Sequence, residues 1–365
     1  MKYLFTVLLF LHGIIHLLGF VKAFKLAPVD QLKSPVSRSS GFFWLLTSLF
    51  FIVSGIAFLC NVQGWYLSAF IAVIISTILI IPSWKDAKFG TIPNLIILMV
   101  IIIDFASFNF WNVYRNEVTN NLLLSSHVIQ SELTETDIQT LPEPVKKYIR
   151  YTGAIGKPKV TCFKIEFTGK LRKDNESEWM PFSSVQYNFL NTSTRLFFLN
   201  ATMKHLPVAG FHCFINGNAF MDIRLFSLFK VQYETGKEMG IAETVTFFND
   251  MCCMAPATLI DKRIKWISVE KNRVKASFTN NHITITGTLY FNDKGELTNF
   301  ISADRYATLE NGEMQKIPWS TPLKNYKRLK ESKLATDAST IYNYPSGVFC
   351  YGTFNLTNIE YNCTK

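Results

Sequence analysis

Charged residues are scarce in the first third of this 365-residue chain. Up to residue 118 the sequence holds eight Lys and Arg and four Asp and Glu, whereas the remainder holds 29 and 23. This scarcity excludes an ordinary solvated surface for the first third, because the surfaces of soluble domains are rich in charged side chains. The chain therefore divides into an apolar amino-terminal part and a polar, strand-patterned remainder.

Motifs that mark common enzymes and cofactor sites are also missing. The sequence contains no H-E-x-x-H, G-x-S-x-G, G-x-G-x-x-G or P-loop pattern, and His205, His212 and His282 are scattered along it. We find no zinc, hydrolase or nucleotide signature, and we expect no metal and no cofactor. The net charge of +10 is shared by both parts, and the longest basic cluster, residues 324–330, suits a solvated strand edge. We therefore expect no nucleic-acid partner.

Cysteine is sparse, and no two of the seven residues have C-x-x-C spacing. The six that follow residue 118 are an even number, which permits disulfides in an oxidising compartment, and Cys350 with Cys363 is one candidate pair. Cys252 and Cys253 are adjacent and would point about 100° apart on a helix, so they suit a hydrophobic core.

Four long apolar runs occupy the first third, at residues 3–24, 41–60, 65–81 and 92–111. Each is about 17 to 22 residues long, which is enough to cross roughly 30 Å of hydrocarbon as a helix. The first run lacks a short apolar core followed by an A-x-A-like cleavage site, so we interpret it as a retained span and not as a signal peptide. The sequence predicts four transmembrane helices within residues 1–114.

The distribution of Lys and Arg indicates an orientation. The first and third loops between the spans hold six of these residues, whereas the other ends hold two. Since basic loops remain on the inner side of a membrane, the first and third loops should lie inside. Both termini and the large carboxyl-terminal domain would then be extracytoplasmic, with the lipid bilayer as the first expected partner.

Three ionisable residues fall inside the predicted spans. His12 and His16 are one helical turn apart on one face of the first span, and Asp104 lies near the middle of the last. Burying charge in a bilayer is costly, so these side chains should either hydrogen-bond between helices or form a proton relay or small-ion site. Alternatively, Asp104 lies closer to the interface. Three candidate ligands on separate helices are too weak a pattern to predict a metal site.

The polar part begins with a linker or stalk at residues 115–140 and continues as a β domain at residues 141–365. Alternation of apolar and polar residues dominates from Val160 onward and predicts roughly ten to twelve antiparallel strands. An amphipathic helix at residues 241–254 interrupts them and should cover the apolar face of the sheet. The predicted fold is thus four membrane helices plus an α+β domain, a strongly curved antiparallel β-sheet or partial barrel with a covering helix.

Several stretches of the polar part together resemble a known family. These are Leu141-Pro142 with Val145 and Tyr148, Trp179-Met180-Pro181-Phe182, residues 243–250 with Pro256 and Leu259, Arg305-Tyr306, Pro318-Trp319 with Tyr326, and residues 351–362. Over about residues 141–362 the chain resembles an uncharacterised bacterial family of unknown function. The resemblance implies a fold similar to that of periplasmic lipoprotein carriers, with a lipid-sized apolar cavity, in a bacterial inner or cell membrane protein. It also implies a basic residue where Thr246 stands and Glu where Asp250 stands.

A cavity of this kind would be lined by the covering helix and the sheet. The candidate ligand-binding residues are Trp179, Phe247, Phe248, Met251, Met254 and Trp319. The same side chains would equally fill an ordinary core, and the sequence leaves both possibilities open.

Glu243 and Asp250 are seven residues apart, so their carboxylates share one helical face about 10 Å apart along the axis. Paired acids at such a separation can perform general acid and base catalysis, whereas pairing of one acid with Arg305 would fix the helix to the sheet. No nucleophile or metal motif accompanies them, so these three residues are weak catalytic candidates.

We predict a membrane protein of unknown function whose outward β domain binds a lipid or other apolar ligand. Transport or sensing through the intramembrane His and Asp residues, and a membrane-surface enzyme, are the alternatives.

Overall fold

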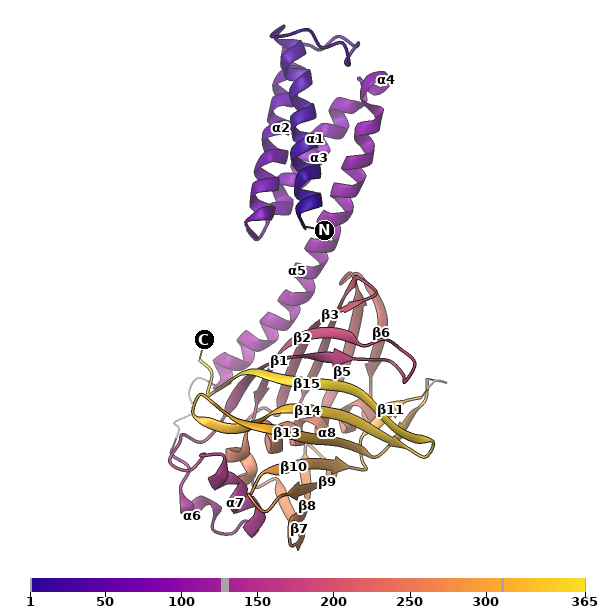
Figure 1. Ribbon diagram of the computed structural model, residues 1–365. Coiled ribbons are helices and arrows are strands. Elements are labelled where there is room, and N and C mark those ends of the chain that lie inside the picture. Colours follow the sequence, from indigo (N-terminus) through magenta and orange to yellow (C-terminus); the bar gives the residue numbers. More distant parts are fainter. Residues whose placement is uncertain (1, 126–130, 310–311, 365) are drawn as a thin grey trace. The chain divides into compact units, whose positions relative to one another are not determined.

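The computed structural model describes residues 2–125, 131–309 and 312–364 (Figure 1). By its internal contacts the chain divides into two compact units, Met1–Asn109 and Phe110–Lys365. Helix α5 (Thr91–Ser125) runs through the boundary and therefore contributes to both units.

The first unit is entirely helical. Its other elements are α1 (Lys2–Ala23), α2 (Arg38–Leu59), α3 (Trp65–Ile80), α4 (Trp84–Ala87) and the 3-10 turn η1 (Lys88–Gly90). Small residues let α1 and α2 approach closely: a Cβ added at Gly19 would come within 2.3 Å of the Trp44 ring. Leu9 and Phe51 are fully buried between the helices, so the apolar runs pack on one another as well as facing outward.

Among the described residues, three helices and not four are long and apolar enough to cross a membrane. They are Lys2–Ala23, Arg38–Leu59 and the stretch Trp84–Ser125, with mean hydropathies of 2.3, 2.3 and 2.1. Helix α3 forms where the third span was predicted, but it has 16 residues. At 1.5 Å per residue it is about 24 Å long, short of the roughly 30 Å of a hydrocarbon core. The prediction of four spans is corrected to three candidates and one shorter apolar helix.

The second unit combines a large β-sheet with short helices. Its helical elements are α6 (Glu135–Ile138), α7 (Glu143–Tyr151), α8 (Lys237–Met254) and the 3-10 turn η2 (Pro256–Ile260). Its strands are β1 (Cys162–Leu171), β2 (Met180–Phe189), β3 (Thr194–Met203), β4 (Leu206–Ile215), β5 (Asn218–Leu225), β6 (Phe229–Thr235), β7 (Ile264–Glu270), β8 (Arg273–Asn280), β9 (Ile283–Phe291), β10 (Leu297–Ser302), β11 (Tyr306–Thr308), β12 (Met314–Lys316), β13 (Trp319–Leu329), β14 (Ser332–Tyr344) and β15 (Gly347–Tyr361). The described strands exceed the ten to twelve expected.

Thirteen strands form one sheet in the order β6-β5-β4-β3-β2-β1-β15-β14-β13-β10-β9-β8-β7, and β11 pairs with β12 alone. Every pair in the large sheet is antiparallel, and β6 and β7 are its two free edges, so the sheet is open. Helix α8 contacts β4, β5 and β6 near one edge and β9 and β10 near the other. One helix can touch such distant strands because the sheet curves around it (Figure 1). The predicted antiparallel sheet with a covering helix is confirmed.

The outer face of the sheet is covered by the last part of α5. The ring of Tyr114 lies 5.4 Å from that of Phe198 on β3 and 5.6 Å from that of Phe211 on β4. Val118 and Leu122, on the same helix face, are buried with them. Residues 115–125, which the sequence suggested as a stalk, therefore belong to a helix packed against the sheet, and residues 126–130 lie outside the described residues.

Candidate functional site

A charged cluster lies in the interior of the second unit, between α8 and the sheet. Glu243 and Asp250 project from one face of α8, as their spacing predicts. Arg195 of β3 reaches both acids: its Nη1 lies 3.0 Å from Glu243 Oε2, and its Nε lies 2.8 Å from Asp250 Oδ2. All three residues are more than nine-tenths buried. The cluster is therefore an ion triad removed from water.

Amide side chains from β2 complete the surroundings of Asp250. Gln186 Nε2 donates to Asp250 Oδ2 at 2.8 Å, and Asn188 Nδ2 donates to the same oxygen at 3.2 Å. Gln186 Oε1 in turn accepts from Arg195 Nη2 at 2.9 Å. The alternation of β2 brings both amides to the inner face, and Asn188 stands directly opposite Arg195 in the β2–β3 pairing.

Arg305 is a second cation near Glu243, on the side of its Oε1 atom. Its Nη1 donates to Ala242 O at 2.7 Å and to Thr246 Oγ1, and its Nη2 lies 3.8 Å from Glu243 Oε1. Its guanidinium also stacks over the Trp319 ring at 4.8 Å. The expected contact between Arg305 and the helix is present, but Arg195 makes the closer ion pairs. Arg195 is therefore the closest cation to both acids.

The two acids respond differently to burial. Desolvation raises the pKa of Glu243, but Arg195 and Arg305 together outweigh it, so that pKa lies below its ordinary value. At Asp250 desolvation outweighs the stabilisation by Arg195 and Asn188, and the pKa is raised.

His212 lies near the same cluster, and burial lowers its pKa to about 4. The Glu243 carboxylate favours the protonated imidazole, but this effect is smaller than the combined effect of lost hydration and of repulsion from Arg195 and Arg305.

We expect His212 to make the second unit sensitive to mild acid. The unfolded chain binds a proton at His212 near pH 6.5, whereas the folded chain binds it only near pH 4. Stability from this residue is therefore complete above pH 6.5 and is lost as the pH falls toward 4. His212 is half-buried, so solvent screens part of the shift in its pKa. We therefore expect the free energy of unfolding to fall by only about 1 kcal/mol between pH 6.5 and 5.

The measurement is the free energy of unfolding of wild type and His212→Gln across this pH range. The variant should lack the decline between pH 6.5 and 5. His282→Asn is the matched control, because His282 is exposed and Asn tolerates its positive φ of 68°. An unchanged pH dependence in His212→Gln would contradict the assignment.

The geometry of the cluster favours a structural role. The carboxylates of Glu243 and Asp250 already accept hydrogen bonds from Arg195, and Asp250 accepts two more from amides. A catalytic acid or base needs hydrogen-bonding reach to a substrate, and these oxygens are directed at protein donors away from solvent. The cluster fixes α8 to β2, β3 and the Arg305 segment.

Five of the six residues expected to line a ligand cavity lie in the hydrophobic core. They are Phe247, Phe248, Met251, Met254 and Trp319, and each is at most 5% exposed. The Phe248 ring stacks on Phe278 at 5.1 Å with 2° between the planes. Trp179 is apart from these five: it is 37% exposed, and Arg172 lies over its ring at 4.6 Å.

The intramembrane candidates separate into two groups in the first unit. The rings of His12 and His16 are 4.6 Å apart; His12 Nε2 lies 2.8 Å from Asn94 Oδ1, and His16 Nε2 lies 2.9 Å from Ser76 Oγ. Asp104 instead accepts from Trp65 Nε1 at 3.0 Å. The sequence predicted hydrogen bonds between helices for these three side chains. Among the described residues the histidines bond to a neutral amide and a neutral hydroxyl group, and not to the Asp104 carboxylate.

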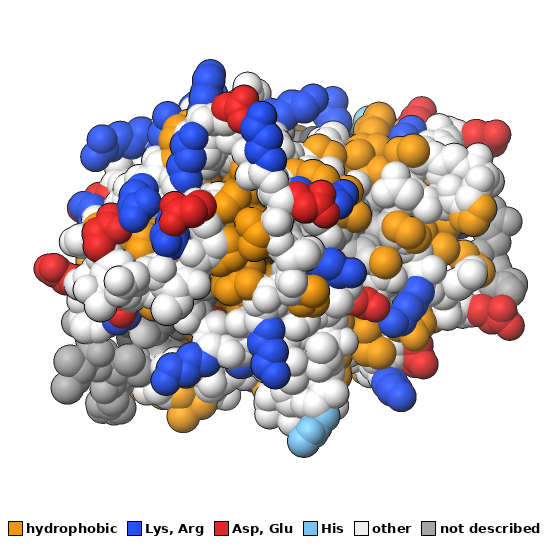
Figure 2. All heavy atoms as spheres, turned by 90° about the horizontal axis from the view of Figure 1, so that it is seen from below, with side chains coloured by type: hydrophobic (Ala, Val, Ile, Leu, Met, Phe, Trp, Pro, Cys, Tyr) orange, Lys and Arg blue, Asp and Glu red, His pale blue; other side chains and the backbone are white. Residues whose placement is uncertain are grey.

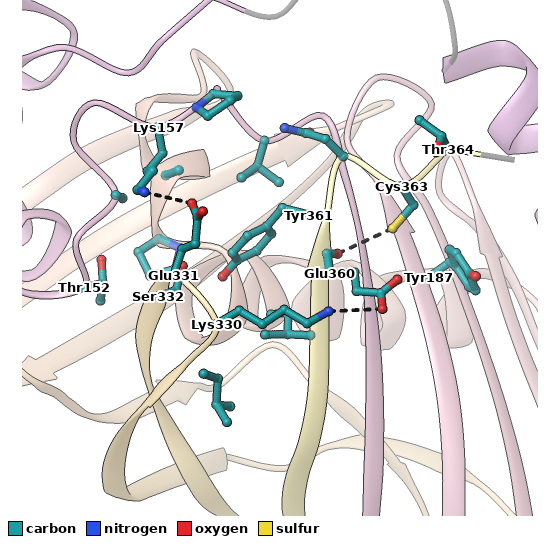
Figure 3. Close-up of a pocket in the computed structure, with 18 residues that line it drawn as sticks. Thr152, Lys157, Tyr187, Lys330, Glu331, Ser332, Glu360, Tyr361, Cys363 and Thr364 are labelled. Carbon is teal, nitrogen blue, oxygen red and sulfur yellow. Dashed lines mark hydrogen bonds and ion pairs between the residues drawn. The ribbon is translucent and has the colours of Figure 1, made fainter.

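A pocket opens at one end of the second unit, where the loop after α7, the β13–β14 turn, η2 and the end of β15 meet (Figure 3). Its volume is about 610 Å³. Its apolar lining residues are Ala154, Pro158, Val160, Pro256, Ala257, Leu329 and Ile359. Two ion pairs stand at its rim, Lys157–Glu331 at 2.8 Å and Lys330–Glu360 at 3.1 Å. On the face of the molecule that Figure 2 shows, hydrophobic side chains gather in a central hollow, with Lys, Arg, Asp and Glu side chains around it.

All seven cysteines are free thiols. Cys363 lies at the pocket and packs beside Cys162, whose Sγ is 3.6 Å from the Cys363 carbonyl oxygen. The Cys350 thiol instead contacts the Gly352 carbonyl at 3.6 Å. The candidate pair Cys350 with Cys363 is therefore not formed, whereas Cys252 and Cys253 are buried in the core as expected.

Sequence reasoning missed Arg195 and the pocket. One signal for Arg195 was available: it precedes the run Leu196–Leu199, in which both faces of the strand are apolar, so an arginine there requires a buried partner. No comparable signal marks the pocket, because its lining comes from segments as far apart as residues 152 and 364.

A helical apolar unit joined to an open antiparallel sheet around α8 makes this an α+β protein with a helical amino-terminal region. A family model matches residues 131–354, more than half of the chain, and the chain belongs to the Family of unknown function (DUF6544). Membership in a family of unknown function, as the sequence suggested, is confirmed. No curated protein matches the chain.

The solved structures to which the chain is similar have low sequence identity and TM-scores below 0.5. A putative outer membrane lipoprotein-sorting protein domain from Vibrio parahaemolyticus is 10% identical, with a TM-score of 0.33 over 55% of this chain and 85% of that one. A DUF1329 family protein from Desulfovibrio piger is 7% identical, with a TM-score of 0.36 over 64% and 94%. A LolA superfamily protein from Nitrosomonas europaea is 9% identical, with a TM-score of 0.28 over 61% and 93%. At these values the similarity carries no information about function.

Proposed function

We propose that this chain is a membrane-anchored protein whose extracytoplasmic β domain binds a lipid or another amphipathic ligand with an apolar tail. The observation that carries the proposal is the pocket of about 610 Å³ in the second unit. Its volume falls within the roughly 300–1,000 Å³ typical of small-molecule sites. Apolar lining below and paired charges at the rim suit a ligand with one apolar and one polar end.

The first unit supplies the anchor in this proposal. Helices α1, α2 and α5 cross the bilayer, and α3 is a short fourth pass, which local thinning of the bilayer accommodates. The basic loops between α1 and α2 and between α3 and α5 lie inside. Both termini and the β domain then lie outside, where the pocket is reached from the extracytoplasmic solvent.

The rim charges define how an anionic head group would be held. Lys157 and Lys330 are each paired with a glutamate, and the side chains of both lysines are substantially exposed, at 43% and 56%. Exposed ion pairs contribute little stability, about 0 to 1 kcal/mol. A phosphate or carboxylate can therefore exchange with Glu331 or Glu360 at small cost, while the ligand's tail enters the apolar part of the pocket.

The alternatives receive less support from the geometry. An enzyme using Glu243, Asp250 and Arg305 would need these groups to reach a substrate, and they are buried and paired with one another and with Arg195. A relay through His12, His16 and Asp104 would need the three to be connected, and the described contacts of Asp104 lead to Trp65.

We expect a lipid-sized mass to remain on the wild-type full-length chain in native mass spectrometry from mild detergent. Leu329→Lys should reduce its retention at least about tenfold, because an unpaired charge beside the ligand tail costs well over 1.4 kcal/mol. Val348→Lys is the matched control: it also lies in a hairpin of β14 but is 64% exposed and outside the pocket. Equal retention by wild type and Leu329→Lys, with both folded, would overturn the proposed site.

A further inference from the structure

Two neighbouring hairpins of the second unit carry an exposed apolar surface. They are the β3–β4 and β5–β6 hairpins, and their tips touch through a hydrogen bond from Phe226 N to Pro207 O of 2.9 Å. The exposed side chains at these tips and along the edge strand β6 are Leu206, Leu228, Phe229, Val231 and Tyr233. Phe229 is 63% exposed. Burying a phenylalanine side chain contributes roughly 1.5 to 3 kcal/mol, so leaving one in water is unfavourable.

The same tips are basic. Lys204, His205 and Lys230 are exposed, and residues 203–208 and 225–231 contain no acid. Asp222, farther along β5, accepts from Arg224 and lies 3.9 Å from Lys230, so it offsets only part of the positive charge. An apolar surface rimmed by lysines complements the boundary between acyl chains and anionic head groups of a bilayer.

Within the second unit, residues 110–125 of α5 run along the sheet in a direction that bears on this surface. Asn121 contacts Thr192, just before β3, at 3.2 Å, whereas the ring of Phe110 lies 5.4 Å from that of Phe198, farther along β3. Helix and strand therefore run in opposite directions, and the amino end of this part of α5 leads toward the hairpin tips. Arg224, next to the β5–β6 tip, stacks over the Phe110 ring at 4.2 Å. Phe110 lies near the end of the apolar run of α5, residues 92–111.

We propose that the tips of the β3–β4 and β5–β6 hairpins dock onto an anionic lipid bilayer, the same bilayer that the apolar run of α5 enters. This inference rests on the membrane anchor of the proposed function but not on its ligand pocket. Phe229, Leu228 and Leu206 enter the acyl boundary, while Lys204 and Lys230 contact lipid phosphates. Docking also covers the end of β6, an apolar edge strand that would otherwise invite association with another chain.

The test is site-specific photo-crosslinking of the full-length chain in nanodiscs that contain phosphatidylglycerol. A photoreactive phenylalanine analogue replaces Phe229, and lipid adducts are measured by mass spectrometry. The same analogue at Val269 is the matched control, because Val269 is 54% exposed in the β7–β8 hairpin at the other edge of the sheet. We expect roughly tenfold more lipid adduct at 229 than at 269. Lys204→Glu with Lys230→Glu should lower the adduct at 229 roughly fivefold or more.

A third probe separates this inference from the anchor itself. The analogue at Leu95, within the apolar run of α5, reports whether the helical unit lies in the bilayer. Lipid adducts at 95 without adducts at 229 would overturn the docking surface and leave the anchor standing. Absence of adducts at both positions would overturn both. Adducts at 229 with a second copy of the chain in place of lipid would overturn the bilayer as occupant.

Discussion

Replacing Arg195 by methionine should lower the free energy of unfolding of the second unit by about 3 to 5 kcal/mol, because removing one partner of a buried ion cluster leaves uncompensated charge. Both Glu243 and Asp250 lose their closest cation in this variant, at 3.0 and 2.8 Å. Arg305 does not replace it, since it stands 3.8 Å from Glu243 only. Chemical unfolding of the full-length chain, followed by fluorescence, measures the loss.

Two further variants separate the charge effect from lost packing. Arg273→Met is the matched control: Arg273 pairs with Glu270 at 2.5 Å, but both side chains are about half exposed, so we expect a change of at most about 1 kcal/mol. Adding Glu243→Gln and Asp250→Asn to Arg195→Met removes the stranded charges and should recover part of the stability. If the triple variant is no more stable than Arg195→Met, uncompensated charge is not the cause.

Phe248→Ala should also destabilise the second unit by about 3 to 5 kcal/mol, the cost of truncating a fully buried aromatic residue. The side chain is fully buried, its ring stacks on Phe278, and the ring of Phe300 meets it at 5.7 Å. Truncation would therefore leave a cavity that its neighbours fill only in part. The measurement is again the free energy of unfolding.

This result decides between a filled core and a ligand cavity on this face of α8. Ile267→Ala, at a site 55% exposed on β7, should cost less than about 0.5 kcal/mol and serves as control. A loss below about 1 kcal/mol for Phe248→Ala, together with weaker ligand retention, would instead indicate that Phe248 lines a ligand site. The expected result would mean that side chains fill the space beneath α8, so the pocket beside Leu329 would remain the proposed ligand site.

Elements that depend on local pattern were predictable. The helix expected at residues 241–254 forms as Lys237–Met254, because its apolar residues recur with helical spacing and Pro256 follows its end. Alternation identified the antiparallel strands in the same way. The run predicted as the third span, residues 65–81, forms as α3 and ends at Ile80, but its 16 residues are fewer than a helix needs to cross roughly 30 Å of hydrocarbon.

The candidate site was only partly predictable, because spacing determines which residues share a face but not what stands opposite. The seven-residue interval placed Glu243 and Asp250 on one face of α8, and Arg305 was expected near it. Arg195 lies 48 residues before Glu243 and reaches it only through the curvature of the sheet. The position of Arg195 on an apolar strand indicates that its guanidinium needs a buried acidic partner, but the sequence does not show which acid that is.

The sequence by itself determined an apolar helical part, an antiparallel β part with one covering helix, and membership in a family of unknown function. These follow from hydrophobic periodicity and from short motifs, which act over a few residues. Only the tertiary structure decided that Arg195 holds both acids, that His12 and His16 meet Asn94 and Ser76 and not Asp104, and that the pocket forms beside Leu329 and Ile359. Such contacts join residues far apart in the chain, and they depend on how strands curve and how far side chains reach, which no local pattern encodes.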